Sequence, residues 1–253
     1  MGTDAEIFIF DHEVYLTTVV PAFVEIFREA RVADWLYPFV ERRELEPSSW
    51  KRSDLARLAT CLNTDLSWVG PYDLKFTYDQ NWRQRWSNAG KDSENAPSDD
   101  TVEQVNWLFK KAVSLKCLGQ GQFIGRSMTV SHYLELLPAL EVKQADSINQ
   151  LLAALGKRGF IISYQFGFGF EGVNGWLNPL ETADLARRLD SLRLPRYEIS
   201  FAGMEQFFQP ETRTYECPGF SFEELSLSFV RTVATLAAAE GRGILWGNGL
   251  PSY

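Results

Sequence analysis

The chain has 253 residues, 45% apolar and 23% charged, a composition typical of a folded protein whose core needs no disulfide or metal for support. A net charge of −8 argues against a surface that neutralises phosphates, so we expect no nucleic-acid partner. No apolar run is long enough to span a bilayer and no secretory signal is recognisable, so we expect a cytoplasmic protein without a membrane partner.

The first third of the chain predicts one strand followed by short helices. Residues 5–10, AEIFIF, predict the strand. Residues 15–30 show helical spacing, and Pro21 is placed to begin the main helix at its first turn. Two further helices are predicted at residues 35–40 and from Ser53 onward.

A change of composition follows in the middle of the chain. Residues 64–86 are rich in Trp, Tyr and Phe, and acidic residues offset their Lys and Arg, so packing in a core or an interface is favoured over a nucleic-acid stacking platform. Residues 87–100 are polar and predict a mobile loop. We expect a single domain over residues 1–253, with this loop as the only candidate sub-domain boundary.

The next segment predicts a helix and then a turn. Thr101 and Gln104 have the spacing of a capping box, and an apolar stripe continues toward Lys116. Residues 119–127, GQGQFIGRS, lack the spacing and the lysine of a phosphate-binding loop, which favours an ordinary turn with an exposed Arg126.

The second half of the chain predicts well-capped helices. Asp146 is placed to cap a helix that stops at Gly156. Asn178, Pro179 and Glu181 together mark a helix start. Ser221 and Glu224 have capping-box spacing before an amphipathic helix that Gly241 ends, and Pro195 is expected to end the helix before it.

Strands are expected at four places, and together they define the fold class. The apolar run at residues 159–166 predicts a central strand, and residues 242–247 predict a closing strand. With residues 5–10 and 197–202 they predict an α+β fold, a small mixed β-sheet packed by amphipathic helices.

The last third of the chain resembles a known family. The segments "GWLNPLETADLARRLDSL" and "LAAAEGRGILWGN" look like the closing helices and strand of the YfbM-like family of uncharacterised bacterial proteins. The resemblance rests on helix caps and aliphatic stripes. It implies an α+β fold and supplies no catalytic residues.

One glycine motif invites a cofactor interpretation that the surrounding sequence does not support. Gly167, Gly169 and Gly172 spell G-x-G-x-x-G, but residues 173–177 separate them from the next helix, whereas a dinucleotide site needs that helix directly after the glycines. We therefore expect no cofactor.

The residue types of metal and nucleophilic sites are sparse. Cys61, Cys117 and Cys217 lie far apart and predict reduced thiols, neither a zinc site nor a disulfide framework. His12 lies in "DHE", but consecutive side chains point apart and do not converge easily on one ion. We expect no metal, and the sequence identifies no catalytic residue.

Two functions remain open. The first is a non-catalytic module that binds another protein, as an immunity or regulatory factor does; the acidic charge and the aromatic middle of the chain favour it. The second is an enzyme or small-molecule binder with an unrecognised polar and aromatic cleft, favoured if the two strongest strands pair. The residues expected to gather in that cleft are Tyr164, Gln165, Glu171, Trp176, Trp246 and Asn248.

Overall fold

A computed structural model describes residues 4–59, 99–126, 136–143, 146–158, 172–196, 208–212 and 214–250. Four strands form its main sheet in the order β2-β1-β6-β3. Their bounds are Asp4–Phe10 for β1, Leu118–Arg126 for β2, Gly172–Leu177 for β3 and Gly243–Asn248 for β6. The α+β class is confirmed. All three pairings are antiparallel, so the described sheet is not of the mixed type expected from the sequence.

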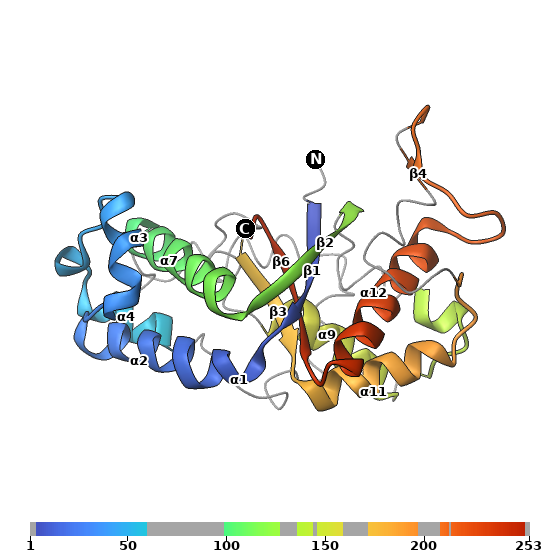
Figure 1. The fold of residues 1–253 in the computed structure, drawn as a ribbon, viewed down its shortest axis with the longest axis horizontal. Helices are drawn as coiled ribbons and strands as arrows, with labels where there is room; N and C mark the ends of the chain where they lie inside the picture. Colours follow the sequence, from blue (N-terminus) through green and yellow to red (C-terminus); the bar gives the residue numbers. More distant parts are fainter. Residues whose placement is uncertain are drawn as a thin grey trace.

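Helices cover both faces of this sheet, as Figure 1 shows. On one face lie α1 (His12–Val14), a π-helical turn (Tyr15–Val19), α2 (Val20–Glu29), α3 (Tyr37–Arg42), α4 (Arg52–Ala59) and α7 (Asp99–Cys117). On the other lie α9 (Ser147–Lys157), α11 (Pro179–Asp190) and α12 (Phe222–Ala239). A small hairpin pairs β4 (Phe208–Gln209) with β5 (Thr214–Tyr215). None of the helices within these ranges has the length and apolar character to cross a bilayer.

The alternation of side chains along β1 divides the interior into two cores. Ile7 and Ile9 belong to the core that contains α9, α11 and α12, whereas Phe8 and Phe10 belong to the core that contains α2, α4 and α7. Successive side chains of a strand point to opposite faces, so the unbroken apolar run of β1 is the pattern of a strand covered on both sides.

The predicted caps of three helices are confirmed. The Asp146 side chain accepts a hydrogen bond from the Ile148 backbone N–H, and capping boxes start α11 at Asn178 and α12 at Ser221. These side chains satisfy backbone N–H groups that have no partner within the helix. Gly241 follows α12 with a φ of 66°, a left-handed conformation that suits glycine.

The start of α7 and the end of α11 differ from the prediction. α7 begins at Asp99, so Thr101 lies buried inside the helix and does not start it, and Gln104 instead accepts a hydrogen bond from the Trp50 indole at 2.7 Å. α11 ends at Asp190, well before Pro195, with Ser191 as its C-cap.

Two strands that the sequence did not predict belong to the sheet of the described residues. Residues 118–126 form β2 along β1, so the interpretation of 119–127 as a turn is wrong, and residues 172–177 form β3 along β6. The predicted strands at 159–166 and 197–202, the aromatic stretch 64–86 and the polar loop as far as residue 98 lie outside the described residues.

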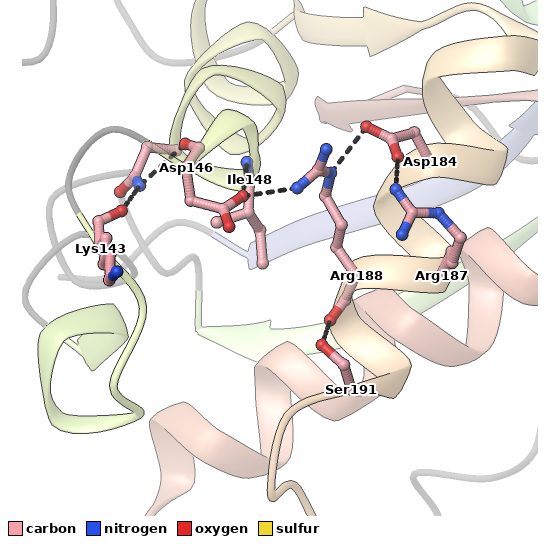
Figure 2. A network of polar contacts seen from close by, with 8 residues as sticks. Lys143, Asp146, Ile148, Asp184, Arg187, Arg188 and Ser191 are labelled. Carbon is pink, nitrogen blue, oxygen red and sulfur yellow. Dashed lines mark hydrogen bonds and ion pairs between the residues drawn. The ribbon is translucent and has the colours of Figure 1, made fainter.

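A surface network ties the start of α9 to α11, as Figure 2 shows. The Arg188 guanidinium donates to Asp146 at 2.8 Å and to Asp184 at 2.7 Å, and Arg187 also contacts Asp184. Partial burial raises the pKa of Asp184, but hydrogen bonds from the two arginines outweigh it and hold that pKa below its ordinary value. The network therefore stabilises the fold above about pH 4 and weakens in stronger acid.

Candidate functional site

The two tryptophans of the predicted cleft lie on neighbouring strands but not in one cleft. Trp176 of β3 lies opposite Leu245 of β6, and Trp246 lies opposite Gly175. Both indoles are buried, Trp176 in the core beside α7 and Trp246 in the core beside α12. The expectation of a shared cleft is wrong for this pair, because residues one register position apart on paired strands point to opposite faces of the sheet.

The other four residues of that prediction are described in part or not at all. Tyr164, Gln165 and Glu171 lie outside the described residues. Asn248 ends β6, where its backbone lies opposite Gly172. Their gathering in a cleft stays a prediction.

Trp176 is the centre of a buried polar group at the β3 end of the described sheet, which we call the Trp176 cluster: Trp176, His12, Arg158 and Glu181. The Arg158 guanidinium lies over the indole, 3.8 Å from the ring centroid, and its Nη1 lies 2.7 Å from Glu181 Oε2. The Arg158 side chain is only 2% exposed, so its charge is held away from water by an aromatic face and a carboxylate.

Glu181 does two things in this cluster. As the third residue of α11 it accepts a hydrogen bond from the Asn178 backbone N–H at 2.9 Å and completes the capping box. The same Oε2 accepts from Arg158. The capping role is visible in the sequence, but the ion pair is not, because Arg158 lies after the glycine that was expected to stop α9. The helix in fact continues to Lys157, and Arg158 is its C-cap.

The His12 ring also lies beside Trp176, with 5.0 Å between the ring centroids. Burial lowers the pKa of His12, and the positive charge of Arg158 lowers it further, while the carboxylates of Glu181 and Asp11 oppose the shift. The imidazole is therefore neutral near pH 7. Its Nε2 is buried and makes no hydrogen bond within the part of the chain that the structure describes.

The residues that flank His12 do not form a metal site with it. Asp11 caps α1 and pairs with Arg242, and Glu13 is exposed. Among the described residues, no three His, Cys, Asp or Glu side chains are grouped to hold an ion.

The Cys117 thiol and the Tyr15 hydroxyl are buried near the cluster, and both stay protonated at physiological pH. Burial raises the pKa of the Cys117 thiol to about 12, and it also raises the pKa of Tyr15 well above its ordinary value. A thiol is a nucleophile in its ionised form, so Cys117 is chemically quiet and packs as a small apolar side chain.

Glu181→Gln is expected to lower the free energy of unfolding by about 1.5–3 kcal/mol, because Arg158 stays buried while its charged partner becomes neutral. Urea unfolding monitored by circular dichroism measures the change. The matched control is Glu224→Gln, which alters the equivalent capping glutamate of α12 at an exposed position. Equal losses in the two variants would contradict a special role for the buried ion pair.

A second group lies on the surface between α3 and α7, and we call it the α3–α7 seam: Trp35, Phe39, Arg43, Trp107, Lys111 and Lys116. Trp107 lies between two cations, with Arg43 at 5.5 Å and Lys111 at 5.6 Å from its ring centroid. Lys116 lies 5.1 Å from the Trp35 ring. Phe39 contacts Trp107 edge-on, so the seam combines aromatic rings with cations.

The seam is open to solvent. Gln104, Trp107, Lys111 and Leu115 follow at three- and four-residue spacing and form the partly exposed stripe of α7, whose other faces are largely buried. Leu115 is 47% exposed, and so is Tyr37 at the start of α3. Large exposed apolar side chains therefore lie on the same two helices as the cationic seam. Sequence reasoning missed it because its residues come from two segments more than sixty positions apart.

Comparison of the chain with protein-family profiles, with curated proteins and with solved structures gives no match. The resemblance to YfbM-like proteins accordingly stays a prediction.

Proposed function

We propose that this chain is a cytoplasmic, non-catalytic module that binds another protein, as immunity and regulatory factors do, and that the α3–α7 seam is its contact surface. The observation that carries the proposal is the pair of partly exposed tryptophans, Trp35 and Trp107, each beside a cation, together with exposed Tyr37 on α3 and exposed Leu115 on α7. Trp, Tyr and Arg are the residues that most often dominate binding energy at protein interfaces.

The charge of the seam indicates the chemistry of the partner. Arg43, Lys111 and Lys116 give it a positive character on a chain whose net charge is −8. Glu103 approaches Arg43 at 3.8 Å, but both side chains are more than half exposed, and such surface pairs are weak. An acidic protein surface with apolar side chains therefore complements the seam best.

Site-specific photo-crosslinking tests the location of the contact. A photoreactive phenylalanine analogue in place of Tyr37 is expected to crosslink one protein partner in the cell. The same analogue in place of Leu180, which is 83% exposed on α11, is the matched control and is expected to give no such product. The same product from both positions would contradict binding at the seam.

The energy of the contact is tested with the partner so identified. Trp107→Ala is expected to weaken binding by on the order of 2 kcal/mol, roughly thirtyfold, because a ring at the centre of an interface is fully desolvated on binding. Isothermal titration calorimetry measures the dissociation constant, and circular dichroism checks that the variant is folded. Leu180→Ala is the control. An unchanged dissociation constant for folded Trp107→Ala would contradict the proposal.

A further inference from the structure

A surface hollow of about 470 Å³ is lined by residues of α11 and α12 and by Arg196, which follows α11 in the chain. Its volume falls within the range of sites that hold small molecules. The polar residues that line it are Arg187, Asp190, Arg196, Arg231, Thr232 and Thr235. Three guanidinium groups line it; Arg187 pairs with Asp184, which lies outside the lining, and Arg196 pairs with Asp190 of the lining itself.

The guanidinium groups of the hollow are held in place by other contacts. Arg231 is only 6% exposed and donates to the Pro195 carbonyl at 2.6 Å and to Ser228 Oγ at 2.9 Å. Arg196 pairs with Asp190 at 3.0 Å and also donates to its backbone carbonyl. The buried Arg231 side chain, fixed in this way, loses little conformational entropy when a ligand binds.

The arginines of the lining donate hydrogen bonds, whereas its threonines are available as acceptors. Thr232 donates its hydroxyl proton to the Ser228 carbonyl at 3.1 Å, and Thr235 donates to the Arg231 carbonyl at 2.8 Å. A hydroxyl whose proton is used in this way offers only lone pairs to a further partner. The lining therefore combines cationic donors for an anion with oxygens that accept hydrogen bonds from hydroxyl groups.

We infer that the hollow binds a small organic anion that carries a phosphate or carboxylate together with hydroxyl groups, such as a sugar phosphate or a sugar acid. Guanidinium groups recognise both kinds of anion through paired N–H donors. The hydroxyl groups of the ligand would donate to Thr232, Thr235 or Asp190, which are the acceptors of the lining. This inference is independent of the protein-binding function proposed for the seam.

Four probes test recognition of the anion and of the hydroxyl groups separately: glucose 6-phosphate, gluconate, glucose and inorganic phosphate. Isothermal titration calorimetry of the full chain at low ionic strength is expected to show binding of at least one of the first two. Glucose and phosphate each lack one recognised group and are expected to bind about tenfold more weakly or less. The comparison of glucose 6-phosphate with gluconate identifies the preferred anion. No binding by either at millimolar concentration would overturn the inference, and equal binding of phosphate would overturn the role of the hydroxyls.

Paired variants locate the site. Arg187 and Arg196 are both about two-thirds exposed, so the double variant Arg187→Gln with Arg196→Gln is expected to fold and to bind about tenfold more weakly. The control is Arg28→Gln with Arg193→Gln, which removes the same charge at exposed positions outside the lining. The control is expected to bind like the parent. Equal weakening in both would show a general charge effect and overturn the assignment to the hollow.

Discussion

Gly175→Ala is expected to lower the free energy of unfolding by more than about 3 kcal/mol, a large part of the total stability of a protein domain. A β-carbon at Gly175 would stand within 3 Å of the backbone carbonyl oxygens of Ala154 and Leu155 in α9. Backbone atoms cannot turn aside as a side chain can, so α9 would have to move off β3. Urea unfolding of the purified variant measures the loss, and recovery of little folded protein is the extreme form of the same result.

The matched control is Gly119→Ala on β2. A β-carbon there would lie 3.5 Å from Ile9, which is ordinary van der Waals contact. A small change in either direction is expected, because alanine also reduces the freedom of the unfolded chain. If Gly175→Ala were as mild as the control, the close packing of α9 on β3 would be wrong.

Phe229→Ala is expected to cost about 3–5 kcal/mol of unfolding free energy. The Phe229 side chain is fully buried in the core between α12 and the sheet, so removing its ring leaves a cavity that rigid neighbours fill poorly. The loss is calculated from the shift in the urea concentration at half-unfolding, provided that the dependence of the unfolding free energy on urea concentration is unchanged. Leu180→Ala, at an exposed position, is expected to change stability by less than about 0.5 kcal/mol. A loss below about 1 kcal/mol for Phe229→Ala would contradict burial of this face of α12.

Helix caps and apolar stripes were the parts of the fold that could be predicted. The capping boxes at Asn178 and Ser221 and the cap at Asp146 depend on neighbouring residues alone, so a short sequence contains all the information they need. The strand at residues 5–10 was equally visible, because both of its faces are apolar. Local signals of this kind give the elements and leave their pairing undetermined.

The strands β2 and β3 were missed because both contain glycines, which weaken the sequence pattern of a strand. A strand is recognised by β-branched and aromatic side chains, and glycine weakens that signal. At Gly175 the absence of a side chain is what allows α9 to lie directly on the strand. The feature that makes the packing close thus removes the pattern by which the strand would be recognised.

The candidate sites were missed because distant segments build them. Arg158 meets Glu181 and Trp176 only after α9, α11 and β3 have packed together. The predicted cleft failed at its two tryptophans through register: Trp246 lies opposite Gly175 instead of Trp176. A shift of one residue decides which face a side chain occupies, and no local pattern reports it.

The order of strands in the sheet also constrains when the protein can fold during its synthesis. The two central strands, β1 and β6, pair Phe8 with Leu245 across nearly the whole chain. While a ribosome is still adding residues before Gly243, β1 can pair only with β2 within the described sheet, and β3 lacks its neighbour. Open apolar strand edges bind other chains, and contacts between distant residues form slowly. The nascent chain is therefore most exposed to aggregation just before translation of β6, and a premature stop there would release a protein that cannot complete its sheet.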